Sequence, residues 1–325
     1  MRRREFITLL GGAAAAWPLA AQSQQSAIPV IGSVFAASAA EWADNMTGFR
    51  RGLAETDFVE GRNVVIEYRW AESPDQMVAM AADFINRKVA VIVTGGNTEG
   101  VRRVLAATRI IPIVFTTALD PIAAGLVASL NRPGGNATGV NFMVGSLVAK
   151  QLELMHEVLP GVTRIAILLY RNNPVMSEAT LAGAQMAAAH LGLEMIVVKA
   201  ASENEIEAAF ASAVQQGAAA LFAVDAYFTA RREGIAALGL RHNLPTFSVP
   251  QAAAAGAVMG YGASIPDSYR QAGVYAGRIL KGEKPGDLPV QQPTTFKLAI
   301  NLKTAKALGL TIPESFLLRA DELIE

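Results

Sequence analysis

Short apolar runs alternate with amphipathic segments over the first half of the chain. The runs are rich in β-branched residues, which is typical of buried strands, and the segments repeat apolar residues every three or four positions, as amphipathic helices do. The predicted strands cover residues 28–35, 64–68, 89–94 and 112–115, and the predicted helices residues 44–56, 74–87 and 98–107. This alternation indicates a parallel sheet with helices on both faces.

The same order of elements returns in the second half. Strands are predicted at residues 164–170, 193–199, 218–224 and 244–249, and helices at 177–191, 203–216 and 229–242. Because the order repeats without repeating residue identities, we predict an α/β fold of two Rossmann-like lobes with parallel sheets.

Residues 110–142 join the two halves. A strand and a polar loop lead to Asp120-Pro121, an N-cap followed by proline, which predicts the start of a helix. A Pro/Gly-rich break at residues 131–136 would end that helix before a second short strand. We interpret this stretch as the last strand of the first lobe, its cleft-facing loop and the crossing into the second lobe.

The C-terminal part has too few elements for a third domain. It predicts a strand at 259–264, a helix at 269–280, a Pro-rich link at 284–293, a strand at 296–301 and a helix at 302–308. We expect these pieces to return across a hinge of crossing strands and to complete both lobes. Lobe 1 would then comprise residues 24–140 plus about 262–292, and lobe 2 residues 141–261 plus about 293–325.

The N-terminus has the pattern of a targeting segment. Three arginines at positions 2–4 precede an apolar run at 9–16 and a small-residue exit, which predicts a cleaved signal peptide of the twin-arginine type over residues 1–23 and export to the periplasm. The chain has no Cys, so disulfides, thiolate metal sites and a lipid anchor on cysteine are excluded. After residue 23 no apolar run reaches the ~18–20 residues that span a bilayer.

Composition and motifs narrow the function. The 325 residues suit two domains, and 28 basic against 28 acidic residues form no basic stripe, so no nucleic-acid partner is expected. The three histidines have no metal-ligand spacing, and nucleophile-elbow, phosphate-loop and zincin motifs are absent from the sequence. We therefore expect no catalysis, no metal and no cofactor.

Polar loops are predicted to follow the strands, where ligands of parallel sheets bind. The turn Gly95-Gly96-Asn97-Thr98 precedes a helix and is the best anion site, although Asn97 and Thr98 equally suit a helix cap. Asp225 ends an apolar strand and is the best cation partner, although it also suits an N-cap. Further candidates for ligand contact, each with an equally ordinary structural use, are Ser38, Thr117, Asp120, Asn172, Asn173, Tyr227, Ser248 and Tyr261.

Several segments resemble a known family. Residues 61–71 (GRNVVIEYRWA), 112–115 (PIVF), 129–136 (SLNRPGGN), 269–273 (YRQAG) and 301–306 (NLKTAK), together with Asp120-Pro121, are similar to the ABC transporter substrate-binding proteins of the TrpX-like group, which have the type I periplasmic-binding fold. The resemblance implies two lobes that close around a small ligand and deliver it to an ABC permease in the inner membrane. Characterised relatives bind aromatic amino acids.

The same resemblance implies roles for individual residues. Gly96, Asn97, Thr98 and Thr117 would hold the ligand carboxylate, and Asp225 its ammonium group. Arg171 departs from the neutral loop expected at its position and leaves room for an acidic or non-amino-acid ligand. We therefore expect a monomeric periplasmic receptor for a small polar or zwitterionic ligand, such as an aromatic or other amino acid. The alternatives are a cofactor-dependent exported enzyme and a ligand-sensing module for a membrane sensor kinase.

Overall fold

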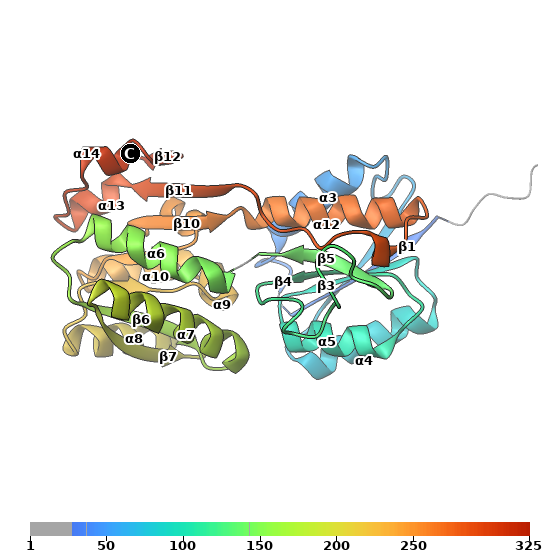
Figure 1. The fold of residues 1–325 in the computed structure, drawn as a ribbon, viewed down its shortest axis with the longest axis horizontal. Helices are drawn as coiled ribbons and strands as arrows, with labels where there is room; N and C mark the ends of the chain where they lie inside the picture. Colours follow the sequence, from blue (N-terminus) through green and yellow to red (C-terminus); the bar gives the residue numbers. More distant parts are fainter. Residues whose placement is uncertain (1–27, 37, 143) are drawn as a thin grey trace, which may run out of the picture.

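Two α/β bodies lie end to end in the computed structural model of the chain, which describes residues 28–36, 38–142 and 144–325 (Figure 1). The targeting segment expected at residues 1–23 lies outside the described residues. Among the helices of the described ranges, none is both long and apolar enough to cross a membrane.

Lobe 1 is built on a five-stranded sheet in which every neighbouring pair is parallel, in the order β2-β1-β3-β4-β5. The strands are β1 (Val30–Phe35), β2 (Val65–Trp70), β3 (Val91–Gly95), β4 (Ile113–Thr117) and β5 (Ala137–Asn141). Helices α3 (Ala43–Ala54) and α12 (Ile265–Leu280) pack on one face, and α4 (Pro74–Asn86) and α5 (Thr98–Ala107) on the other. The central strands β3 and β4 are buried along their whole length, and each begins with a run of three apolar residues, as expected for strands covered on both faces.

Lobe 2 is built on a seven-stranded sheet in the order β12-β11-β10-β9-β8-β6-β7. The strands are β6 (Arg164–Tyr170), β7 (Glu194–Ala200), β8 (Leu221–Phe222), β9 (Thr246–Ser248), β10 (Met259–Ala263), β11 (Phe296–Asn301) and β12 (Glu322–Ile324). All pairs are parallel except β10 with β11. That pair is antiparallel because the chain leaves lobe 2 after β10 and re-enters it with β11.

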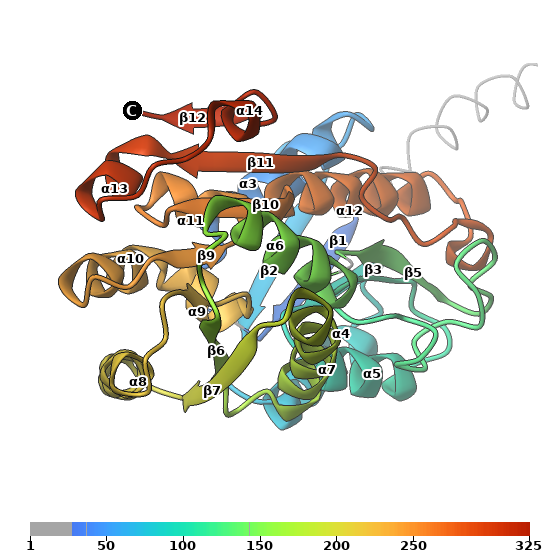
Figure 2. The same cartoon turned by 60° about the vertical axis from the view of Figure 1, so that its left-hand side comes forward.

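Helices cover both faces of the second sheet (Figure 2). One apolar cluster includes residues of α6 (Val144–Val158), α7 (Pro174–Leu191), α13 (Leu302–Ala307) and α14 (Glu314–Leu317). The cluster on the other face includes residues of α8 (Glu203–Gln215), α9 (Ala226–Ala230) and α10 (Arg232–Arg241). The short helix α11 (Pro250–Ala254) follows β9, and a 3₁₀ turn, η1 (Pro285–Asp287), follows α12.

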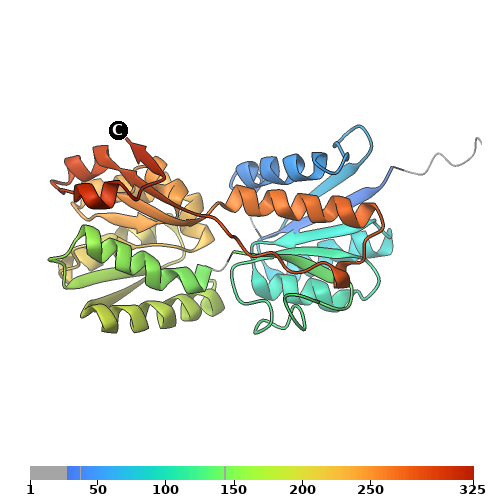
Figure 3. The ribbon, with the colours of Figure 1, turned by 45° about the horizontal axis from the view of Figure 1, so that its top comes forward.

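The lobes are joined where the chain passes from β5 to α6, from β10 to α12, and from η1 back to β11 (Figure 3). The predicted fold class, two Rossmann-like lobes with parallel sheets linked by crossing segments, is confirmed, with the single antiparallel pair as an addition.

The prediction of a helix after Asp120-Pro121 was wrong. Asp120 does accept hydrogen bonds from the N–H groups of Ile122 (2.8 Å) and Ala123 (3.2 Å), as an N-cap would. However, Gly125 has a φ of 69°, which ends the turn, and residues 121–136 contain no helix or strand.

Elements of lobe 2 also differ from the predictions. The helix expected at 229–242 is two helices, α9 and α10, that meet at Arg231, where φ is −105°. The strand expected at 218–224 is only the two-residue β8. Helices α6, α11 and α14 and the edge strand β12 were not predicted.

Helices α3 and α12 approach each other at glycines. A Cβ atom on Gly52 would lie 1.8 Å from the Arg270 carbonyl oxygen, and one on Gly273 would lie 2.1 Å from the Phe49 carbonyl oxygen. Backbone atoms cannot move aside as a flexible side chain can, so this contact requires glycine. The helix pair also brings together Trp42, just before α3, and Tyr269 of α12, whose hydroxyl accepts a hydrogen bond from the Trp42 Nε1 at 2.8 Å.

We expect Gly52→Ala to lower the free energy of unfolding by about 1–3 kcal/mol, because the new methyl group overpacks the α3–α12 contact. Gly234→Ala in α10 is the matched control, since a Cβ atom there meets nothing within 4 Å. That control should raise stability by about 0.5–1 kcal/mol through helix propensity. Urea denaturation of both variants measures the difference, and equal midpoints would contradict this account of the packing.

Candidate functional site

A cavity of about 150 Å³ lies between the lobes, and residues of both lobes line it. It contains six of the residues predicted from the sequence as ligand contacts: Gly96, Asn97, Thr98, Thr117, Asn173 and Asp225. The structure therefore brings together the proposed anion site and the proposed cation partner, which lie on different lobes.

The lobe 1 side of the cavity is the turn from β3 into α5. Gly96 has a φ of 85°, and a Cβ atom there would lie 2.9 Å from the Ala36 carbonyl oxygen, so only glycine fits. Asn97 is the N-cap of α5, because its Oδ1 accepts a hydrogen bond from the Gly100 N–H at 2.9 Å. The Thr98 and Thr117 hydroxyls are 3.3 Å apart.

This turn suits an anion. Asn97 satisfies the third N–H of α5, and the first two N–H groups of a helix have no intrahelical acceptor. The helix dipole adds positive potential at the same end. The arrangement can therefore bind a carboxylate through N–H groups and hydroxyls without a basic side chain.

The lobe 2 side of the cavity is dominated by Asp225, which is only 8% exposed. Its carboxylate accepts hydrogen bonds from the Tyr227 N–H at 2.8 Å and from the Asn173 amide at 3.3 Å. Burial raises the pKa of Asp225 to about 6, and these two hydrogen bonds only partly oppose that rise. No Lys or Arg of the described chain forms an ion pair with it. A buried carboxylate without an ion-pair partner favours the binding of a cation, which would offset the cost of its buried charge.

Apolar side chains form a further part of the cavity wall, and the sequence analysis did not predict them. Trp42, Phe142 and Met176 line the cavity. Trp42 is fixed because its Nε1 donates to the Tyr269 hydroxyl at 2.8 Å, and that hydroxyl also lies 3.0 Å from the Thr116 hydroxyl. Burial raises the pKa of Tyr269, which stays protonated and can take part in both hydrogen bonds.

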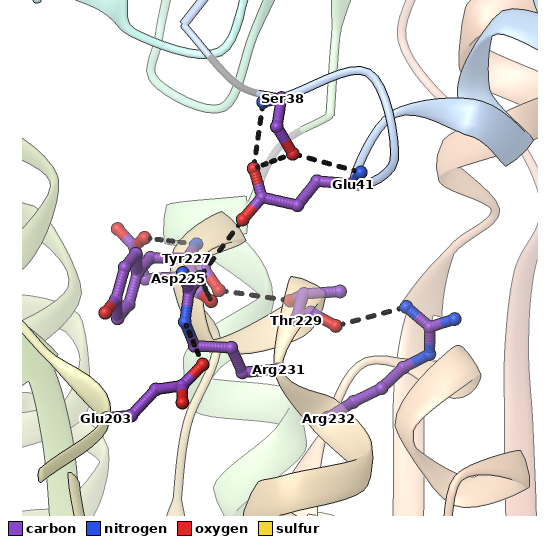
Figure 4. Close-up of polar contacts among 8 residues, drawn as sticks. All are labelled: Ser38, Glu41, Glu203, Asp225, Tyr227, Thr229, Arg231 and Arg232. Atoms are coloured by element: carbon purple, nitrogen blue, oxygen red, sulfur yellow. Dashed lines mark hydrogen bonds and ion pairs between the residues drawn. The ribbon is translucent and has the colours of Figure 1, made fainter. Parts of the chain in front are cut away.

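Glu41, whose polar contacts are drawn in Figure 4, also lines the cavity and was not predicted from the sequence. Its carboxylate accepts hydrogen bonds from the Ser38 N–H and the Ser38 hydroxyl, both at 2.9 Å. Ser followed three residues later by Glu is the spacing of a capping box, and that signal could have drawn attention to Glu41. Ser38, predicted as a ligand contact, is exposed, does not line the cavity, and holds Glu41 instead.

Three other predicted residues lie away from the cavity lining. Asp120 is exposed and caps its own turn. Asn172 is exposed. Ser248 is buried and donates a hydrogen bond to the Ala223 carbonyl oxygen.

The two tyrosines predicted to stack on a ligand contact other side chains. The Tyr227 ring stacks on Tyr170, with centroids 4.1 Å apart, and the Arg231 guanidinium carbon lies 3.7 Å from its centroid. Tyr261 packs beside Phe296 at 6.1 Å. Arg171 pairs with Glu205 at 3.2 Å and does not line the cavity.

Among the described residues, no group of three or more His, Cys, Asp or Glu side chains is placed to hold a metal ion.

Comparisons with known proteins identify the family of the chain. The profile of the family described as ABC transporter substrate binding protein matches residues 29–324. A tyrosine-binding protein of Clostridioides difficile (strain R20291) is 25% identical over 265 residues, which cover 81% of this chain and 76% of that protein.

Solved structures are also similar. A conserved domain protein of Vibrio cholerae is 27% identical, with a TM-score of 0.81, and the match covers 91% of this chain and 100% of that one. An ABC domain in complex with L-Trp from Streptococcus pneumonia is 25% identical, with a TM-score of 0.78, and the match covers 92% and 100% of the two chains.

Two α/β lobes with parallel sheets are the type I periplasmic-binding fold that the resemblance implied, and these structures share that fold with the chain. Because the family profile spans nearly all of the described residues, the chain belongs to the family of ABC transporter substrate-binding proteins.

Proposed function

We propose that this chain is the periplasmic receptor of an ABC importer and binds a free amino acid between its lobes. The proposal rests on one observation above all. A buried carboxylate without a cationic partner, Asp225, and a helix N-terminus flanked by the Thr98 and Thr117 hydroxyls line the same cavity. An α-amino acid carries an ammonium and a carboxylate group, and would place one on each lobe.

The apolar wall supports an aromatic side chain. Trp42, Phe142 and Met176 would pack against a ring, since aromatic and thioether groups make favourable contacts with aromatic faces. Two similar proteins, a tyrosine-binding protein and a structure in complex with L-Trp, favour the same ligand class.

Transport requires export and a membrane partner. We propose that residues 1–23 are a cleaved twin-arginine signal and that the mature chain is a monomer that docks on an inner-membrane permease. Lobe 1 would be residues 24–140 with about 262–292, and lobe 2 residues 141–261 with about 293–325. The family consists of solute-binding proteins, and we propose no catalytic role for this chain.

Calorimetry with L-tyrosine, L-tryptophan and L-phenylalanine tests the ligand class. Phenylpropionate lacks the ammonium group and phenethylamine lacks the carboxylate, so both should bind far more weakly than L-phenylalanine. Small-angle scattering should show compaction with a true ligand. Failure of every free amino acid to bind or to raise the melting temperature would refute the proposal.

Asp225→Asn should weaken amino-acid binding about 30-fold or more, because it removes one partner of a buried charge pair. Asn is as good an N-cap as Asp, so the fold should be retained. The control is Asp321→Asn, whose carboxylate accepts the Leu298 N–H in lobe 2, away from the cavity. Phenylpropionate has no ammonium group, so the Asp225→Asn variant should bind it no more weakly than the unsubstituted protein does. A much weaker affinity of the variant for phenylpropionate would contradict the assignment of the ammonium group to Asp225.

The pH dependence of the ligand-free protein follows from the same residue. The pKa of Asp225 rises from 3.8 to about 6 on folding, so the folded state binds more protons than the unfolded state in that window. The contribution of Asp225 to the free energy of unfolding should therefore fall as pH rises from about 4 to about 6, by up to about 3 kcal/mol. Chemical unfolding at several pH values should show Asp225→Asn gaining stability relative to the unsubstituted protein across this range. A constant difference would contradict the burial argument.

Ligand binding should depend on pH in the opposite sense. An ammonium group favours the ionised carboxylate, so amino-acid affinity should rise with pH through about 6, with proton release on binding. Calorimetry in buffers of different ionisation enthalpy counts the released protons, and the Asp225→Asn variant should release fewer.

A further inference from the structure

One ion pair connects the two lobes. The Arg231 Nη1 atom, at the junction of α9 and α10 in lobe 2, lies 3.2 Å from the Glu41 Oε1 atom, just before α3 in lobe 1 (Figure 4). Of the ion pairs in residues 28–36, 38–142 and 144–325, it is the one that crosses the cleft. Both side chains are sheltered, with 26% and 28% of their surfaces exposed.

Each partner is held by its own lobe. Two hydrogen bonds from Ser38 orient the Glu41 carboxylate. Burial acts to raise the pKa of Glu41, but the Ser38 hydrogen bonds and the charge of Arg231 outweigh it and lower that pKa, so Glu41 is ionised at neutral pH. Arg231 lies over the Tyr227 ring at 3.7 Å and donates to the Tyr227 carbonyl oxygen at 3.1 Å. The pair can therefore form when the lobes meet without ordering either side chain anew, which lowers the entropic cost of the contact.

Arg231 also has a second acidic neighbour on its own lobe. Its Nε atom is buried without a hydrogen-bond acceptor and lies 3.7 Å from Glu203 Oε1. Glu203 is the first residue of α8, and its side chain is 81% exposed. A small rotation of the guanidinium would bring this carboxylate within hydrogen-bond distance once Glu41 moves away.

We infer that Glu41 and Arg231 form an interlobe latch, in which Arg231 exchanges Glu41 of lobe 1 for Glu203 of lobe 2 when the lobes separate. The exchange keeps the guanidinium paired in both arrangements. The two glutamates then act in opposite directions, since Glu41 favours the lobes-together state and Glu203 favours the separated state. These residues position the lobes and do not need to contact a ligand themselves.

The absence of cysteine makes a direct test possible. Ile110 in lobe 1 and Met186 in lobe 2 are 86% and 73% exposed and lie outside the cavity lining, so Ile110→Cys and Met186→Cys accept a pair of spin labels. Pulsed electron–electron double resonance on the ligand-free protein then reports the interlobe distance distribution. Because no ligand is added, the result does not depend on whether an amino acid binds.

Glu41→Gln keeps the shape of the side chain and removes its charge. We expect the ratio of the lobes-together to the separated population to fall about two- to fivefold, as loss of a partly exposed ion pair predicts. Glu203→Gln should raise the same ratio, because it removes the competing partner. Arg241→Gln breaks the exposed Arg241–Glu207 pair within lobe 2 and should leave the distribution unchanged.

The latch requires that Glu41→Gln and Glu203→Gln shift the distance distribution in opposite directions. A merely structural role for Glu41 would lower the melting temperature without moving the distance distribution, and that outcome would overturn the latch. Equal shifts in the same direction for Glu41→Gln and Glu203→Gln, or no shift for Glu203→Gln, would overturn the exchange. In the Arg231→Gln background, Glu41→Gln and Glu203→Gln should have no further effect on the distribution, and a persisting effect of either would show that it does not act through Arg231.

Discussion

The site depends on one constraint: parallel strands end at the same edge of a sheet, and the two sheets turn that edge toward each other. In lobe 1 the edge carries the turn after β3 and the end of β4, which supply Thr98 and Thr117. In lobe 2 it carries the loops after β6 and β8, which supply Asn173 and Asp225. Residues distant in sequence thus meet because of sheet topology, and no local motif is needed to bring them together.

Asp225 is an N-cap, and the same side chain could also take the binding role proposed for it. One carboxylate oxygen accepts the Tyr227 N–H and so begins α9, while the other accepts the Asn173 amide. A carboxylate has about four acceptor positions, so these bonds leave capacity for an ammonium group. Burial without a cation makes the ionised form costly, and a bound cation would offset that cost. The N-cap and ligand interpretations are therefore compatible.

The sequence predicted regular elements well where local signals and tertiary packing agree. Strand β6, helix α5 and strand β11 have the predicted bounds, because apolar runs or capping residues mark them clearly. The prediction of a helix after Asp120 was wrong, although Asp120 does cap a turn, because Gly125 ends that turn after a few residues. The apolar wall was missed for another reason: Trp42, Phe142 and Met176 look like ordinary core residues until two lobes leave a space beside them. The Glu41–Arg231 pair joins residues 190 positions apart, beyond the reach of any local pattern.

Helix α9 connects the candidate site to the interlobe ion pair. It has only five residues, with Asp225 at its N-cap and Arg231 at its C-cap. The helix dipole favours an acidic side chain at the N-terminus and a basic one at the C-terminus, so both side chains are favourably placed. A ligand held between Asp225 and the lobe 1 helix α5 would bring α9 toward lobe 1, and Arg231 would move with it toward Glu41. Ligand binding and formation of the Glu41–Arg231 pair would then share this helix, and each would favour the other by the same coupling free energy.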